Sequence, residues 1–182
     1  MTKGISADTT IEDLAAIVSQ ALESAGISAI LSGGAAVSIY SDNEYLSYDL
    51  DFVSSNRLKE IGEALAPLGF TRAGTARQFE HANTQWFIEF PPGPLAFGET
   101  HFADADAWTL RTAHGPLRIV TPTQSVMDRL AAYAHWHDNQ ARDQAVMVAR
   151  HQQVDWQALR AWAEHEGLDV EVIERVRRDA DA

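Results

Sequence analysis

The sequence contains no cysteine. This absence excludes disulfide bonds, a thiolate nucleophile and a zinc site built from cysteine ligands. The sequence also lacks any run of about 18 apolar residues, the length that a membrane-spanning helix needs. Its first ten residues, MTKGISADTT, do not show the apolar run of a secretion signal. We therefore expect a cytoplasmic protein without membrane segments.

Basic residues are scarce as well. The 182 residues include 14 Lys and Arg against 26 Asp and Glu, which gives a net charge of −12. Proteins that hold long stretches of nucleic acid neutralise phosphates with many basic side chains, so this composition argues against an extended DNA-binding surface. Any local basic patch should lie in the second half of the chain, because most of the arginines are there.

Hydrophobic residues make up 46% of the chain, enough for a substantial core, and the length suits one domain. Apolar periodicity and turn residues predict an early mixture of strands and helices and a later run of helices only. Expected strands cover 27–31, 49–53, 70–72, 77–81 and 85–90, with a hairpin over 108–113 and 116–120. Expected helices cover 11–25, 35–40, 57–66, 123–134, 139–150, 155–166 and 169–179, with Thr10 and Asn56 as caps of the first and third.

This pattern predicts an α/β (α+β) fold, with a mixed sheet, flanking helices and a helical C-terminal half. We expect an α/β core over residues 1–120 and a helical region over 121–182 that packs on it. A single domain is the alternative.

The first candidate for chemistry is Ser32-Gly33-Gly34, between an expected strand and an expected helix. Glycines at such a junction let a phosphate approach the backbone, and the start of the helix offers free N–H groups. A tight turn without any ligand is the alternative interpretation.

The second candidate is Asp49-Leu50-Asp51, at the start of an expected strand. Residues two apart on a strand point to the same face, so the two carboxylates should project together while Leu50 enters the core. Neighbouring carboxylates repel each other unless a cation lies between them, and Mg²⁺ is often held in this way together with substrate phosphates. A polar strand edge would show the same residues.

Glu89 is the third candidate, because it lies inside the apolar run Phe87-Ile88-Glu89-Phe90. An acid buried there without a partner would be costly. The cost disappears if Glu89 lies beside Asp49 and Asp51 and completes a site of three carboxylates. A glutamate that faces solvent from a half-exposed strand is the alternative.

Taken together, the Gly-Gly turn, the Asp-x-Asp strand and the later strand acid resemble the polymerase-β-like nucleotidyltransferases. The segments Ser32–Tyr40 and Ser47–Phe52 are more narrowly similar to the AbiEii/AbiGii-type family, which includes toxins of toxin–antitoxin systems. Thr121-Pro122 before a helix with Arg129, and Arg142-Asp143 on the next helix, look like later motifs of that family. The resemblance covers roughly residues 30–162.

The resemblance implies a role for each matching residue. Asp49 and Asp51 would bind Mg²⁺ or Mn²⁺, and Glu89 would activate the acceptor hydroxyl or help to hold a second ion. Arg129 stands where the family commonly has a lysine and would neutralise phosphate charge, although the exchange changes reach and geometry. Ser32, Gly33, Gly34 and Ser38 would surround the triphosphate, and Arg142 and Asp143 would orient the nucleotide or the acceptor.

Each of these helix residues also has an interpretation without a function. Arg129 would then be a cation on the helix surface beside Asp128, and Arg142 and Asp143 would form an exposed charge pair.

The sequence therefore predicts an enzyme that transfers a nucleoside monophosphate from an NTP to an RNA end, a protein or a small molecule. Its acidic composition favours a protein, a small molecule or a locally held RNA end over an extended duplex. The family resemblance adds a toxin role and a cognate antitoxin as expectations. A catalytically weak binding protein with the same fold, or a phosphohydrolase that uses the same acids, are the alternative functions.

Overall fold

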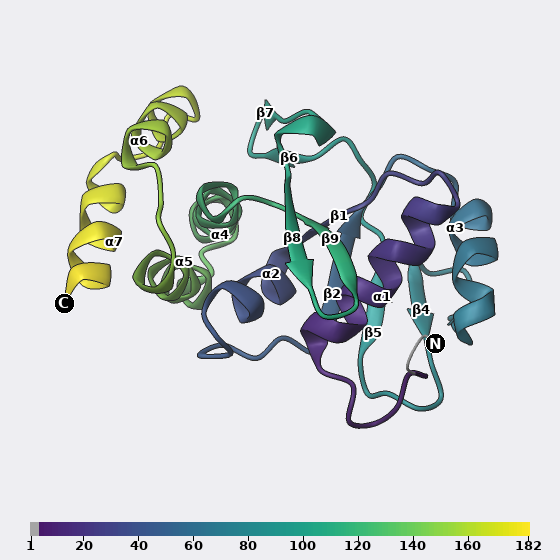
Figure 1. The fold of residues 1–182 in the computed structure, drawn as a ribbon. Coiled ribbons are helices and arrows are strands. Elements are labelled where there is room, and N and C mark those ends of the chain that lie inside the picture. Colours follow the sequence, from purple (N-terminus) through teal and green to yellow (C-terminus); the bar gives the residue numbers. More distant parts are fainter. Residues whose placement is uncertain (1–3) are drawn as a thin grey trace.

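The computed structural model describes residues 4–182. Within this range the main sheet has seven strands in the order β3-β4-β5-β2-β1-β9-β8, and β6 and β7 form a separate hairpin (Figure 1). The strands are β1 (Ile30–Ser32), β2 (Asp49–Val53), β3 (Thr71–Arg72), β4 (Gln78–Glu80), β5 (Phe87–Glu89), β6 (Ala96–Phe97), β7 (Thr100–His101), β8 (Trp108–Thr112) and β9 (Gly115–Ile119).

The α-helices are α1 (Ile11–Ser24), α2 (Gly33–Tyr40), α3 (Leu58–Leu65), α4 (Pro122–Trp136), α5 (Asn139–His151), α6 (Trp156–His165) and α7 (Glu171–Asp181). The sheet is mixed, because β2 pairs with β5 and β1 with β9 in parallel, whereas β1 and β2 are antiparallel. The predicted mixed α/β fold with a helical C-terminal half is confirmed.

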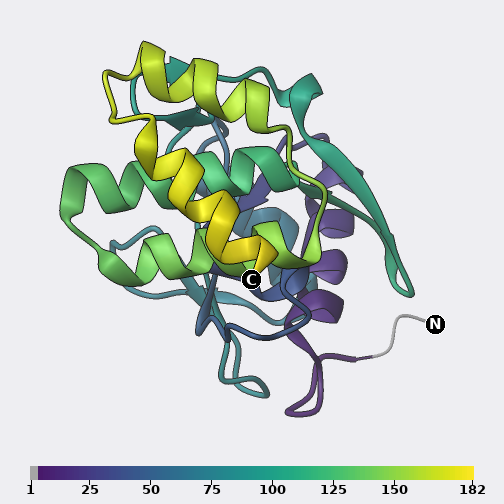
Figure 2. The same ribbon diagram turned by 90° about the vertical axis from the view of Figure 1, so that its left-hand side faces the viewer.

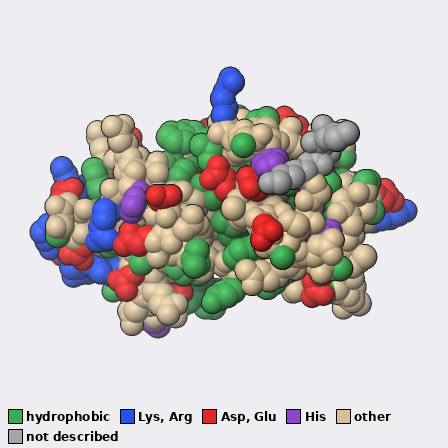
Figure 3. Space-filling model, turned by 60° about the horizontal axis from the view of Figure 1, so that its bottom comes forward, with side chains coloured by type: hydrophobic (Ala, Val, Ile, Leu, Met, Phe, Trp, Pro, Cys, Tyr) green, Lys and Arg blue, Asp and Glu red, His purple; other side chains and the backbone are tan. Residues whose placement is uncertain are grey.

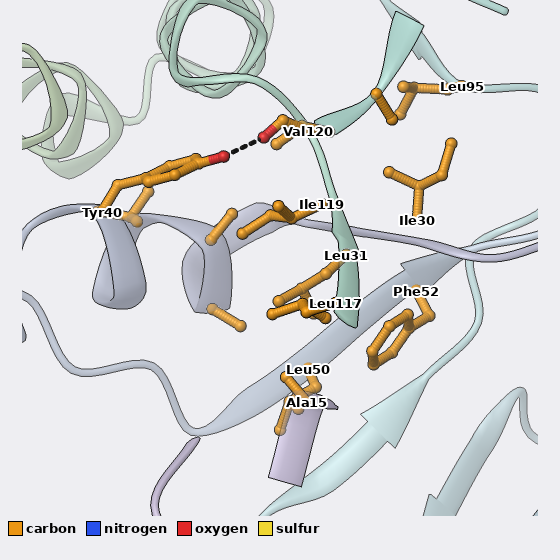
Figure 4. Close-up of a cluster of buried hydrophobic side chains, with 14 of the residues drawn as sticks. Ala15, Ile30, Leu31, Tyr40, Leu50, Phe52, Leu95, Leu117, Ile119 and Val120 are labelled. Atoms are coloured by element: carbon orange, nitrogen blue, oxygen red, sulfur yellow. Dashed lines mark hydrogen bonds between the residues drawn. The ribbon is translucent and has the colours of Figure 1, made fainter. Parts of the chain in front are cut away.

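The central strand β2 alternates between two environments. Leu50 and Phe52 are fully buried, whereas Asp49, Asp51 and Val53, which alternate with them, are only partly buried. Figure 4 shows Leu50 beside Ala15 of α1, so the apolar side chains of β2 face the layer that contains α1. The acidic side chains must therefore point to the opposite face of the sheet, because successive strand residues alternate.

Local sequence signals set most helix starts. The Thr10 hydroxyl accepts the Asp13 N–H at 3.1 Å and caps α1, as predicted. At the start of α4, Thr121 and Gln124 cap each other reciprocally, and Pro122 occupies the first helical position.

Several element boundaries differ from expectation: the first strand covers Ile30–Ser32 rather than 27–31, and the last helix covers Glu171–Asp181 rather than 169–179. The third helix begins at Leu58 with Arg57 as its N-cap, so the prediction that Asn56 caps it is wrong. The Asn56 side-chain amide instead donates to Glu60 at 3.4 Å. The second helix begins at Gly33, directly after β1, rather than at residue 35.

The C-terminal helices pack on the core through α2. Helices α4 and α5 both contact α2, and α7 crosses α5 (Figure 2). The Tyr40 hydroxyl at the end of α2 donates to the Val120 carbonyl at 2.5 Å, and this buried bond fixes the chain just before α4 (Figure 4). A division of the chain at residue 120 stays a prediction. Within residues 4–182, no helix is long and apolar enough to cross a membrane.

Candidate active site

Three neighbouring strands place polar side chains in one row across the acidic face of the sheet. Strand pairing sets Ser32 of β1 opposite Asp51 of β2, and Asp51 opposite Glu89 of β5. Asp49 precedes Asp51 by two residues and shares its face. One carboxylate oxygen from each of Asp49, Asp51 and Glu89 lies within 4.8 Å of the other two. The structure thus brings together the three acids that the sequence singles out.

The electrostatics of this cluster centre on Asp51. Burial, followed by the nearby negative charges of Asp49, Glu89 and Asp128, raises the pKa of Asp51 from 3.8 to about 7. The ionised form of Asp51 is therefore unfavourable in the protein alone, and a nearby cation would stabilise it. Clustered carboxylate oxygens are also the ligands that Mg²⁺ and Mn²⁺ prefer. The residues present therefore fit a divalent cation.

The glycine turn lies directly against this cluster. Gly33 has a φ of +63°, a conformation that favours glycine. A Cβ atom at Gly33 would overlap the Asp51 carboxylate, so any side chain there would displace the acid. At Gly34 a Cβ would lie 2.9 Å from the Ser47 hydroxyl. Gly33 therefore brings the first turn of α2 against Asp51, whereas Gly34 makes room for the loop before β2.

Ser38 is hydrogen-bonded to this loop. It is fully buried, and its hydroxyl donates to the Gly34 carbonyl at 3.2 Å and accepts the Ser47 N–H at 2.9 Å. The Ser47 hydroxyl in turn donates to Asp49, whose carbonyl lies at 2.9 Å and whose Oδ1 lies at 3.1 Å. Ser38 thus acts on the site through Ser47 and Asp49, while its own hydroxyl is engaged within the protein.

Helix α4 contributes two charged residues, Asp128 and Arg129. Arg129 is largely buried, and its guanidinium donates to Gln144 at 3.1 Å and to Asp128 at 2.8 Å. Oδ2 of Asp128 also accepts the Gly33 N–H at 3.2 Å and lies 3.5 Å from the Ser32 hydroxyl. The sequence suggested Arg129 but gave Asp128 no role, because only the packing of α4 on α2 brings this acid to the glycine turn.

A cavity of about 330 Å³ opens beside these groups. Ser32, Gly33, Asp51, Asp128 and Arg129 line one part of it, and the rest is lined by Val53 and by Pro91, Pro92, Pro94, Leu95, Ala96 and Phe97. A second hollow of about 450 Å³ shares Asp128 and Arg129 and extends along α4.

The outer wall of the second hollow belongs to the β6–β7 hairpin, which α6 holds in place. The indole of Trp162 donates to the Phe97 carbonyl at 3.1 Å, and Glu166 accepts the Glu99 N–H at 2.9 Å. Glu166 also accepts a hydrogen bond from Thr100. These hydrogen bonds join the hairpin to α6 and its C-terminal end beside the second hollow.

Arg142 and Asp143 lie elsewhere. Both line a different hollow, between α5 and α7, where Arg142 pairs with Asp179 and contacts Asp143 at 3.5 Å. On the face shown in Figure 3, Lys and Arg side chains gather at the end of the molecule formed by the C-terminal helices, mixed with acidic ones. The structure therefore does not bring Arg142 and Asp143 to the carboxylate cluster.

No protein-family model matches the chain, and no curated protein matches it in sequence. Solved structures do match. An antigenic nucleotidyltransferase-like protein from Paracoccidioides brasiliensis matches with a TM-score of 0.54 and 14% identity, over 79% of this chain and 76% of its own. ANT(2'')-Ia in complex with adenylyl-2''-tobramycin matches with a TM-score of 0.50 and 13% identity, over 90% and 92%.

A solution structure of the antibiotic-resistance factor ANT(2'')-Ia matches with a TM-score of 0.50 and 14% identity, over 92% of this chain and 90% of its own. The narrower resemblance to the AbiEii/AbiGii-type family stays a prediction. At these identities the likeness concerns architecture: the chain has the nucleotidyltransferase fold.

Proposed function

We propose that this protein is a metal-dependent nucleotidyltransferase, which moves a nucleoside monophosphate from an NTP to an acceptor hydroxyl. The observation that carries the proposal is the carboxylate cluster of Asp49, Asp51 and Glu89 next to the Gly33 turn, at the edge of a cavity. The nucleotidyltransferase fold supports it, because the cluster is built on the central strands of that fold.

Asp49, Asp51 and Glu89 would hold the divalent cation. When bound, Mg²⁺ or Mn²⁺ supplies positive charge that neutralises the cluster and the substrate phosphates. The protein places each acid: Ser47 donates a hydrogen bond to Asp49, the Gly33 turn packs closely against Asp51, and strand pairing sets Glu89 opposite Asp51. Such prior orientation matters because phosphoryl transfer depends mainly on positioning and electrostatics.

In the proposed reaction, the acceptor hydroxyl oxygen forms a bond to the α-phosphorus of the NTP. The bond between that phosphorus and the bridging oxygen to the β-phosphate breaks, and pyrophosphate leaves. Glu89, at the end of the carboxylate row, would take the proton of the hydroxyl. Ser32, the Gly33 N–H and Arg129 would donate to phosphate oxygens, since they are the donors that face the cavity.

The acceptor remains a prediction at the level of class: an RNA end, a protein or a small molecule. One structural neighbour was solved with an adenylylated small molecule, adenylyl-2''-tobramycin. The carboxylates that line both hollows favour an acceptor without high negative charge over an extended nucleic acid. The toxin role and the cognate antitoxin rest on the sequence resemblance alone.

The test is label transfer. Purified protein is incubated with each α-labelled NTP, Mg²⁺ or Mn²⁺ and a cell extract, and the extract is examined for labelled RNA, protein and small molecules. We expect transfer with at least one NTP, and its loss in Asp49→Asn, Asp51→Asn and Glu89→Gln. Glu164→Gln, which removes one acid from an exposed position on α6, is the matched control and should retain transfer.

Two results would contradict the proposal. Release of free phosphate or nucleotide without any labelled acceptor would identify a phosphohydrolase. Absence of both transfer and NTP binding, with a protein partner retained on purification, would instead support a binding protein with this fold.

A further inference from the structure

Asp128 occupies a position where a phosphate oxygen would be expected. Its Oδ2 atom accepts the Gly33 N–H at 3.2 Å and the Arg129 guanidinium at 2.8 Å, and lies 3.5 Å from the Ser32 hydroxyl. Gly33 is the first residue of α2, so its N–H has no acceptor within the helix. Three donors of different origin therefore converge on one carboxylate oxygen.

These donors are the ones that a bound triphosphate needs. A helix N-terminus, a hydroxyl and an arginine are common ligands of phosphate oxygens. Ser32, Gly33 and Arg129 line the same cavity as Asp51, whose carboxylate belongs to the acidic cluster. A phosphate cannot accept from the Gly33 N–H while Asp128 does, and the two anions also repel each other.

Other contacts also hold α4 in place. Val126 and Leu130 of this helix are buried, the Thr121 and Gln124 pair caps its start, and Arg129 is also held by Gln144. Asp128 lines both hollows and its side chain is 21% exposed, so the carboxylate borders open space. The carboxylate can thus leave the turn while α4 stays in place.

We propose that Asp128 is an internal substitute for a phosphate group, which must leave the Gly33 turn before the triphosphate of the NTP binds and which thereby sets the affinity of the site. This inference rests on the proposed function. When Asp128 moves away, the Gly33 N–H, the Ser32 hydroxyl and one N–H of Arg129 become free for the incoming phosphate.

The test compares affinities for inorganic tripolyphosphate with Mg²⁺, measured by isothermal titration calorimetry in the full chain. This probe has no base or sugar and reports on the phosphate site independently of any transfer reaction. We expect Asp128→Ala to lower Kd on the order of tenfold, because a competing anion and its charge-assisted hydrogen bonds are removed. Asp128→Asn should give a smaller gain, since its amide oxygen can still accept the Gly33 N–H.

Glu164→Gln is the control for the loss of one negative charge and should leave Kd unchanged. In the transfer assay, the KM for the NTP should fall in Asp128→Ala. A gain in affinity separates this role from a structural one, because damage to the fold would weaken binding. Thermal unfolding of each variant shows whether the fold is retained.

The alternatives give distinct results. If the wild type binds tripolyphosphate and transfers label, but Asp128→Ala binds equally or more weakly, the inference is wrong and the proposed function stands. If neither the wild type nor the variants bind tripolyphosphate or any NTP, the proposed function fails and the inference fails with it. If Asp128→Ala binds tripolyphosphate more tightly while no protein transfers label, the phosphate site is supported and only the transfer reaction is refuted.

Discussion

Replacement of Asp51 by asparagine should stabilise the metal-free protein while abolishing the proposed transfer reaction. Burial and three nearby carboxylates raise the pKa of Asp51 from 3.8 to about 7. Above about pH 7 the Asp51 carboxylate of the folded protein is therefore ionised in a buried environment next to other negative charges. In the unfolded chain the same carboxylate is surrounded by water. The difference in pKa corresponds to roughly 4 kcal/mol, at about 1.4 kcal/mol per pKa unit. Because the cluster is partly open to solvent, we expect Asp51→Asn to gain about 1–3 kcal/mol.

The sign of this effect depends on pH. A carboxyl group whose pKa is raised by folding binds more protons in the folded state, so its contribution to stability declines as pH rises from 3.8 to about 7. The gain from Asp51→Asn should therefore be largest near pH 8 and should shrink toward about pH 5. The asparagine of the variant does not ionise, so the variant lacks this contribution to the pH dependence of stability.

The measurement is urea unfolding of the wild type and Asp51→Asn near pH 5 and near pH 8, with a chelator or with Mn²⁺. Mn²⁺ should stabilise the wild type, because an ion that binds only the folded state shifts the equilibrium toward it, and should have little effect on the variant. Glu164→Gln is the control for an exposed acid. If Asp51→Asn proves less stable than the wild type near pH 8 without metal, the electrostatic reasoning is refuted.

Three further predictions concern the same region. Gly33→Ala should lose Mn²⁺ binding and more stability than Gly74→Ala, since both glycines have positive φ but only a Cβ at Gly33 would overlap the Asp51 carboxylate; equal losses in thermal unfolding would contradict this. Apparent Mn²⁺ affinity, followed by electron paramagnetic resonance, should fall about tenfold from near pH 8 to near pH 6, because protonation of Asp51 competes with the ion; a flat profile would argue against Asp51 as a ligand. Tyr40→Phe should cost about 1–2 kcal/mol in urea unfolding, because the Val120 carbonyl loses its buried donor; an unchanged midpoint would show that the bond contributes nothing.

The position of Arg142 shows a limit of sequence motifs. The sequence makes Arg142 and Asp143 candidates because an Arg-Asp pair on the helix after Arg129 resembles a family motif. In the structure the same residues line the hollow between α5 and α7, where Arg142 pairs with Asp179. A helix motif carries little information about the direction that its side chains take, because that direction depends on which neighbouring helix covers which face.

Asp128 illustrates the converse case. Its sequence context, an acid before an arginine on an amphipathic helix, is ordinary. It reaches the Gly33 N–H only because α4 packs across α2, and that contact joins residues 95 positions apart. Local propensity cannot specify such a contact.

The sequence alone determined the alternation within β2 and the glycine junction after β1, because a strand has a strict period of two and a left-handed turn favours glycine. These rules made Asp49 and Asp51 share a face and placed Gly33 at a turn between a strand and a helix, although the helix itself begins two residues earlier than predicted. The pairing of Glu89 with Asp51 and the contact of Asp128 with the turn arise from the packing of the folded chain. Those placements depend on strand order and helix packing, which many distant contacts fix together.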